Sequence, residues 1–259
     1  MTRDHATAKH LCFGSACLLA YAIAPAAWAD APAFDRPGMG FAPAVLPAGS
    51  FDWEQGLPDI ERDSDGGVRS TTLSADTLFR FGLASTLELQ LAGSPFNRTT
   101  VRGAGLRAHA TGAGDTAIAL KWAPALDSKT NALALLGAVS FDTGSDAFTN
   151  GTTVASFGMA ASHDLGGNRS LGFYANVDHG GGLSTWTASA SLGFPVHGDL
   201  GGYVEFARIA GGGSSSSLAG TGLAWTLHDR VQLDASVDVG LTRHSPDWLA
   251  GVGVSVFFK

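Results

Sequence analysis

Three motifs in this 259-residue chain suggest chemistry, but each lacks part of what that chemistry needs. Residues 141–145 match an aspartic-protease motif, which requires a second carboxylate, and no second copy of the motif exists. Residues 103–108 have the glycine spacing of a dinucleotide-binding loop without the required buried strand and helix around it. Asp63-Ser64-Asp65-Gly66 begins like a calcium loop but lacks the remaining ligands. We therefore expect turns or loops at these motifs and predict no cofactor and no metal.

The histidines do not form a recognisable site either. No two of the histidines that follow the N-terminal stretch have the spacing of a pair of metal ligands. These histidines are His109, His163, His179, His197, His228 and His244. An outer-membrane phospholipase uses a His and a Ser on one strand face. The adjacent pairs Ser162-His163 and His244-Ser245 fit this poorly, because neighbours in a strand face opposite sides. We predict no catalytic residue and keep a lipase- or esterase-type barrel enzyme as an alternative.

The composition points to a glycine-rich β protein. Only 15% of the residues are charged, 35 are Gly, and apolar and polar residues are finely interleaved. These features exclude a helical membrane protein, a coiled coil and a charged disordered chain. A net charge of −7 argues against a nucleic-acid partner.

The one long apolar run lies at the N-terminus. Arg3 and Lys9 precede apolar residues 11–23, and Ala27-Trp28-Ala29 places small residues before a cleavage point. This layout predicts a signal peptide over residues 1–29, cleaved after Ala29; an uncleaved anchor is the rival interpretation. Both cysteines leave with the signal peptide, so residues 30–259 have no disulfide.

The rest of the chain alternates with a period of two residues. In residues 231–241 the odd positions are apolar and the even positions are polar or Gly, and residues 248–258 alternate similarly. About twelve such segments, many of about 9–12 residues, suit tilted strands that cross a bilayer. Short connections alternate with longer ones, the longest near 59–70 and 94–113. We predict an all-β, antiparallel transmembrane barrel of about twelve strands, with a short periplasmic N-terminal segment; a secreted β-sandwich is the alternative.

Placing the apolar face toward lipid turns a set of charged residues inward. The predicted lumen-lining residues are Asp52, Glu54, Asp76, Arg80, Glu88, Lys121, Asp178, Glu205, Asp234 and Asp238. Acids dominate this set. The charges either pair across the interior and plug it, or they line a pore that favours cations or neutral solutes.

The C-terminal strand carries a signal of its own. Outer-membrane barrels end in an amphipathic strand with a terminal aromatic, and here Phe258 precedes the final Lys259. We expect this strand to be read by the barrel-assembly machinery. The expected location is the outer membrane of a Gram-negative bacterium, with outer-membrane lipid and lipopolysaccharide as partners.

Three stretches resemble a known barrel family. Residues 80–89, 112–122 and 141–145 are similar to motifs of the family named for the MetA pathway of phenol degradation, whose members are often called transporters; Asp142 stands where the family usually has Pro. The resemblance implies a channel-like outer-membrane barrel linked to uptake of aromatic compounds. It carries over no catalytic or ligand residue.

The expected function is passive passage or binding of small solutes, aromatic or hydrophobic compounds among them. Besides the barrel enzyme, a non-transporting barrel with a structural or adhesive role is an alternative. An open lumen lined by carboxylates would favour the channel, whereas a lumen packed shut would favour the structural role.

Overall fold

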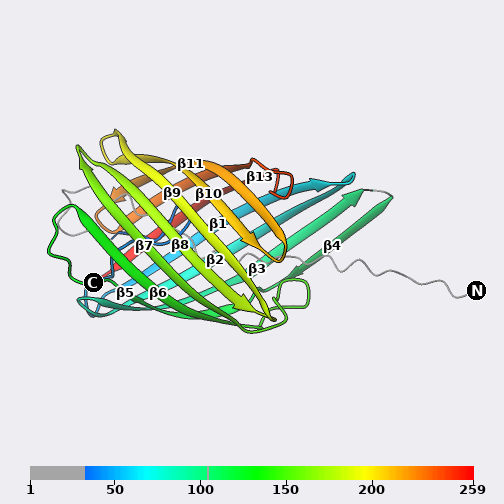
Figure 1. Cartoon of the computed structure of the whole chain (residues 1–259), viewed down its shortest axis with the longest axis horizontal. Helices are drawn as coiled ribbons and strands as arrows, with labels where there is room; N and C mark the ends of the chain where they lie inside the picture. The colour runs from blue at the N-terminus through cyan, green and yellow to red at the C-terminus, as the bar shows by residue number, and fades with distance from the viewer. Residues whose placement is uncertain (1–32, 104) are drawn as a thin grey trace, which may run out of the picture.

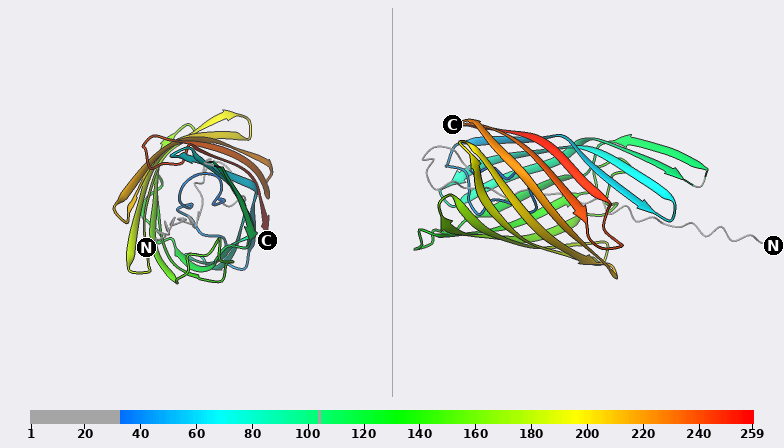
Figure 2. Two further views of the ribbon diagram at one scale, coloured as in Figure 1. Left: turned by 90° about the vertical axis from the view of Figure 1, so that its right-hand side faces the viewer. Right: turned by 90° about the horizontal axis from the view of Figure 1, so that it is seen from above.

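The alternating segments form one antiparallel sheet that closes on itself. The computed structural model describes residues 33–103 and 105–259. Its strands are β1 (Phe51–Asp65), β2 (Val68–Ala84), β3 (Leu87–Gly103), β4 (Leu106–Gly112), β5 (Thr116–Trp122), β6 (Asn131–Phe141), β7 (Val154–Gly166), β8 (Arg169–Gly180), β9 (Leu183–His197), β10 (Leu200–Gly211), β11 (Ser214–His228), β12 (Val231–Gly240) and β13 (Trp248–Phe258). The first strand, β1, pairs with both β2 and the last strand, β13, and this pairing closes the barrel (Figure 1). The left view of Figure 2 looks along the closed wall.

The barrel has twelve strands because β4 and β5 are two parts of one. Both pair with β3, through Asn97 opposite Gly112 and Gly93 opposite Thr116, and only residues 113–115 separate them. The predicted antiparallel barrel of about twelve strands is thereby confirmed.

The alternation along each strand sorts residues between the outside and the interior. In β5, Ala117, Ala119 and Lys121 are buried, whereas Ile118 and Leu120 are 44% and 50% exposed. Large exposed apolar side chains recur on the outside of most strands. Such a surface is unfavourable in water and suits the hydrocarbon of a bilayer. Among the described residues, no helix is long and apolar enough to cross a membrane.

The connections differ from the prediction at one end of the barrel. The regions near 59–70 and 94–113 are not long loops, because β1–β2 and β3–β4 continue as paired hairpins that project past the rim, as Figure 1 shows. Gly66 and Gly67, with φ of 56° and 80°, form a two-residue turn that only residues tolerant of positive φ allow. The predicted alternation of short and long connections is therefore only partly present.

Residues 33–50, the inner segment, lie inside the barrel rather than in a periplasmic extension (Figure 2). The prediction of a periplasmic segment was wrong for these residues. Phe34, Phe41 and Leu46 are at most 4% exposed. Burying these apolar side chains between barrel walls is favourable, whereas a free segment would leave them in water. The predicted signal peptide, residues 1–29, lies outside the described residues.

Candidate functional site: the interior of the barrel

The inner segment makes a circuit of the barrel cross-section. Its contacts begin at β1 and β2, pass to β12 through Arg36, to β10 through Met39, and to β7 and β8 through Phe41. They return to β3 at Leu46 and to β2 at Pro47. The segment thus touches strands on all sides of the lumen.

A cluster of buried charges anchors the two ends of this circuit. We call it the Arg80 cluster; it comprises Asp35, Asp52, Glu54, Arg80, Glu88, Gln90 and Lys121, all at most 1% exposed. The Arg80 guanidinium bonds Glu88 at 2.9 Å, Glu54 at 3.0 Å and Asp52 at 3.3 Å. The Lys121 ammonium bonds Asp35 of the inner segment at 2.8 Å and Glu88 at 3.3 Å. A cation shared among several carboxylates offsets the cost of burying them.

The backbone of the inner segment completes the Arg80 cluster. Glu54 accepts hydrogen bonds from the amides of Asp35 and Arg36, both at 2.7 Å, and Glu88 accepts one from the amide of Leu46 at 2.8 Å. Asp35 accepts one from the amide of Ala42 at 2.9 Å. These hydrogen bonds stabilise the buried carboxylates of the wall and fix the backbone of the inner segment against them.

A second cluster fixes the segment to β1 and to β12, which is separated from β1 only by β13. In this Arg36 cluster the guanidinium of Arg36 donates two hydrogen bonds to Asp59, at 3.1 and 3.2 Å, and two to Asp234, at 3.2 and 3.4 Å. Burial alone lowers the pKa of Arg36, but the Asp234 and Asp59 carboxylates outweigh it and raise the pKa above its usual value. Arg36 thus stays charged. Paired hydrogen bonds from a guanidinium to a carboxylate, as here, are strong and directional.

Glycines in the wall make room for the segment. A Cβ at Gly253 would lie 2.4 Å from Nε of Arg36, and one at Gly82 would lie 2.0 Å from the carbonyl oxygen of Pro47. A Cβ at Gly158 would lie 2.9 Å from the ring of Phe41. These positions explain why part of the high glycine content falls on the inner face of strands.

The far side of the lumen is less charged. Phe41 meets Tyr174 edge to face, with 5.7 Å between ring centroids, and the buried Tyr203 packs against Gly38. The Glu205 carboxylate accepts a hydrogen bond from the amide of Met39 at 3.0 Å. Small residues such as Ala134, Ala138 and Ala160 cover much of the wall near Phe41.

The structure separates the predicted lumen residues into two groups. Asp52, Glu54, Arg80, Glu88, Lys121 and Asp234 are buried in the two clusters. Asp76, Asp178, Glu205 and Asp238 form no ion pair within the described part of the chain. Of these, Asp178 accepts a hydrogen bond from the Ser156 hydroxyl at 2.5 Å, and Asp238 occupies the space left by Gly220.

The prediction missed Asp35, Arg36 and Asp59. The first two are the only charged residues between positions 31 and 51, in a stretch of Pro, Gly, Ala and large apolar residues. An isolated acid–base pair among apolar residues is the signal that could have placed this stretch inside. Asp59 was assigned to a loop because the extension of β1 was not recognised.

The expectation of turns or loops holds for residues 142–145, whereas Asp63, Asp65 and residues 106–108 lie in the paired strands of the projecting hairpins. Residues 142–145 belong to the connection from β6 to β7, where the Gly144 amide donates to Asp115 at 2.9 Å. Gly103 ends β3 one turn before β4 begins, and Asp63 and Asp65 lie at the end of β1. Within the described ranges, no three His, Cys, Asp or Glu side chains group in a way that could hold a metal ion.

One His–Ser contact does exist outside the adjacent pairs weighed above. Nδ1 of His179 lies 2.9 Å from Oγ of Ser184, and the two residues face each other across β8 and β9. Both side chains are exposed near the turn at 181–182.

Solved structures with a similar fold are outer-membrane barrels. The COG4313 outer membrane channel from Pseudomonas putida F1 aligns at 13% identity and a TM-score of 0.65, covering 83% of this chain and 97% of that one. The β domain of the Bordetella autotransporter BrkA aligns at 12% identity and 0.57, covering 80% and 98%. The KdgM porin, in complex with disordered oligogalacturonate, aligns at 10% identity and 0.53, covering 81% and 99%.

Sequence comparison adds the family. No curated protein sequence matches the chain. The model of the family described as "Putative MetA-pathway of phenol degradation" matches residues 34–258, which include most of the inner segment and the whole barrel, and the chain belongs to this family.

Proposed function

We propose that the protein is a passive outer-membrane channel for small solutes, without enzymatic activity, in which the inner segment narrows the path. The observation that carries this proposal is the circuit of residues 33–50 around the lumen, held by two charge clusters. A segment bonded to the wall through Asp35 and Arg36 restricts the size of the solute while leaving the barrel wall intact.

The charge of the interior supports a preference for cations. The acids Asp76, Asp178, Glu205 and Asp238 have no cationic partner in the described residues, whereas the interior bases Arg36, Arg80 and Lys121 are all paired with carboxylates. Carboxylates that line a path attract cations and repel anions. Neutral solutes would be admitted according to size.

Aromatic solutes are the class that the family description favours. The Phe41, Tyr174 and Tyr203 rings are at most 9% exposed, so they pack the inner segment against the wall and do not themselves select the solute. The family's description refers to phenol degradation, which is consistent with this class of solute.

The experiment compares the refolded full chain with the double variant Asp35→Asn/Arg36→Gln in planar bilayers. We expect a small, cation-selective conductance for the unmodified chain and a conductance several-fold larger and noisier for the variant. Arg230→Gln, in the turn between β11 and β12, is the control and should match the unmodified chain. An anion preference, or no conductance from either protein, would overturn the proposal and favour the structural role.

A second candidate function is supported only by the His179–Ser184 contact. A hydroxyl within 2.9 Å of an imidazole is the beginning of a nucleophile–base pair. No residue in the described ranges forms a further hydrogen bond that orients this His179 ring, so the channel is favoured. Hydrolysis of a phospholipid or short ester that disappears in Ser184→Ala would support the enzyme; equal background rates would exclude it.

Recognition of the last strand by the assembly machinery stays a prediction. Phe258 is 47% exposed on the outside and stacks on Phe51 at 5.3 Å, at the seam where β13 pairs with β1. Because the Phe258 side chain is exposed on the last strand, the assembly machinery could contact it before β13 pairs with β1. Slower insertion of Phe258→Ser with purified assembly machinery would support it.

A further inference from the structure

The outer face of the projecting hairpins carries five arginines. Strand register places Arg62, Arg69, Arg98, Arg102 and Arg107 on one face: Arg69 lies opposite Arg102, which in turn lies opposite Arg107. Arg62 lies opposite Thr71 of β2 and Arg98 lies opposite Leu73. Positions 69, 71 and 73 of β2 share one face, so Arg62 and Arg98 share it too. We call this set the arginine face.

The arginine face points away from the lumen. Asp59 of β1 bonds Arg36 inside the barrel, so Glu61 and Asp63, at positions of the same parity, share its face. Arg62 lies between them and faces outward, and the register carries this orientation to the other four arginines. In the projecting hairpins, the acids Asp59, Glu61 and Asp63 thus share the inner face and the five arginines the outer face.

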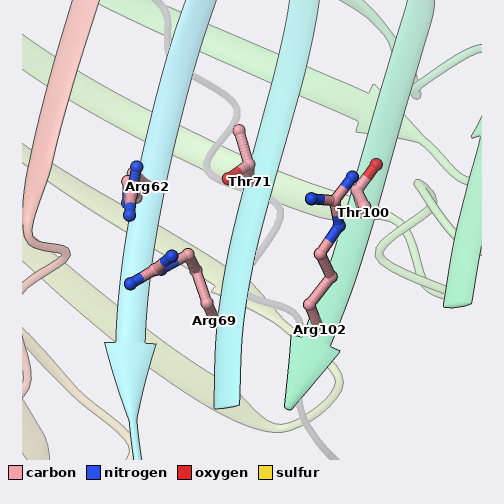
Figure 3. A pocket seen from close by; sticks show the side chains of 5 residues that line it. All are labelled: Arg62, Arg69, Thr71, Thr100 and Arg102. Atoms are coloured by element: carbon pink, nitrogen blue, oxygen red, sulfur yellow. The ribbon is translucent and has the colours of Figure 1, made fainter. Parts of the chain in front are cut away.

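These guanidinium groups are available for a partner. In the part of the chain that the structure describes, none of the five forms an ion pair, and four are exposed while Arg62 is half-buried. Arg62, Arg69 and Arg102 line a hollow of about 270 Å³ together with Thr71 and Thr100. Figure 3 shows these five side chains on β1, β2 and β3. Positive charge gathers here although the whole chain has a net charge of −7.

The height of the face along the barrel identifies the environment. Phe51 stacks with Phe79 and Phe258, and meets Phe81 at a tilt, on the outside at the end where the chain termini of the barrel lie. Arg62 follows Phe51 by eleven residues on β1. With about 3.3 Å per residue and a tilt of about 40°, this distance spans about 25–30 Å, which is the height of the apolar band of such barrels.

The arginines therefore lie where the headgroups of the opposite leaflet begin. Both ends of an even-stranded outer-membrane barrel lie on the periplasmic side, so the opposite leaflet is the outer one. Trp248, opposite Arg62 on β13, is an aromatic of the kind enriched at that interface. Guanidinium groups bind phosphate with paired hydrogen bonds, and threonine hydroxyls can donate to the same oxygens.

We propose that the arginine face is a docking site for the phosphorylated headgroup of the outer-leaflet glycolipid, lipopolysaccharide. Its acyl chains would lie along the apolar outer surface below, where Leu57 and Phe96 are about half exposed. The site is separate from the lumen, so it stands or falls independently of conduction. It orients the barrel in an asymmetric membrane by charge recognition at one rim only.

The test uses the refolded full chain in detergent micelles, with lipopolysaccharide, the same glycolipid after removal of its phosphates, and inorganic phosphate as probes. We expect phosphorylated lipopolysaccharide to co-purify and to raise the melting temperature, and the dephosphorylated form to bind at least tenfold more weakly. Substituting all five arginines by Gln should weaken binding at least a hundredfold, since each basic group near an anionic lipid contributes about fivefold. The control variant Arg169→Gln/Arg230→Gln, at the other end of the barrel, should bind like the unmodified chain.

Two results would overturn the proposal. One is equal binding by the five-arginine variant or by the dephosphorylated glycolipid. The other is complete competition by millimolar inorganic phosphate, which would indicate a site for the free anion. If the five-arginine variant does not fold, Arg62→Gln/Arg69→Gln and Arg102→Gln/Arg107→Gln carry the test, each with an expected loss of about ten- to thirtyfold. Conductance of these variants should stay unchanged, which separates this result from failure of the channel proposal.

Discussion

The inner and outer faces of β1, β2 and β3 use charge in opposite ways. Inside, Arg80 bonds three wall carboxylates and is fully buried. Outside, Arg69 on the same strand has no ion pair in the described residues and is exposed. The inner charges therefore determine how the chain packs, while the outer ones are free to bind a ligand. The difference teaches that parity within a strand, rather than residue type, decides what an arginine does in this protein.

The largest effect is expected from removing the central cation inside. Arg80→Gln leaves Asp52, Glu54 and Glu88 buried without their guanidinium, and we expect a loss of about 3–5 kcal/mol in the free energy of unfolding. Arg69→Gln is the matched variant on the same strand and should change stability by less than about 0.5 kcal/mol. Urea unfolding in micelles measures both. Equal losses would contradict the contrast between the two faces.

A smaller effect is expected from filling the space that a wall glycine leaves for the inner segment. Gly253→Ala places a Cβ 2.4 Å from Nε of Arg36, so the guanidinium must shift away from Asp234 or the segment must move. We expect a loss of about 1–3 kcal/mol and a larger conductance. Gly137→Ala, whose Cβ would meet nothing within 4 Å, is the control. An unchanged conductance with unchanged stability would show that the segment is not held by Arg36.

The outer aromatic cluster should contribute less than the inner charges. Phe51→Leu keeps apolar area but removes ring contacts with Phe79, Phe81 and Phe258. The expected loss is about 1 kcal/mol, measured in lipid vesicles. Phe157→Leu, on the outside of β7, serves as control and should lose less. A loss as large as that of Arg80→Gln would mean that the seam, and not the interior, dominates stability.

The smallest effect on stability is expected from salt, which should separate the buried inner charges from the exposed outer arginines. Between about 0.05 and 0.5 M salt the screening length falls several-fold, which weakens exposed interactions far more than buried ones. The loss in the free energy of unfolding caused by Arg80→Gln should change by less than about 0.5 kcal/mol between these two salt concentrations. Binding of lipopolysaccharide to the arginine face should weaken severalfold. Salt-insensitive binding would indicate that acyl chains, not phosphates, carry the affinity.

Much of the barrel could be predicted from the sequence. The period-two pattern in residues 231–241 identified β12, and the family resemblance from residues 80–89, 112–122 and 141–145 is confirmed by the family match. The hairpin extensions of β1 and β3 were missed, because their polar, arginine-rich sequence resembles an exposed loop. The inward placement of charges in the strands followed directly from alternation.

The barrel and the side of each strand that faces lipid follow from the sequence alone, because alternation is a local property and a one-residue shift would put Arg80 or Glu54 in the hydrocarbon. The return of residues 33–50 into the lumen depends instead on the folded barrel. That placement depends on Asp35 meeting Lys121 and Arg36 meeting Asp234, partners 86 and 198 positions apart. No local pattern encodes contacts at such separation, and they exist only once the closed wall brings the partners together.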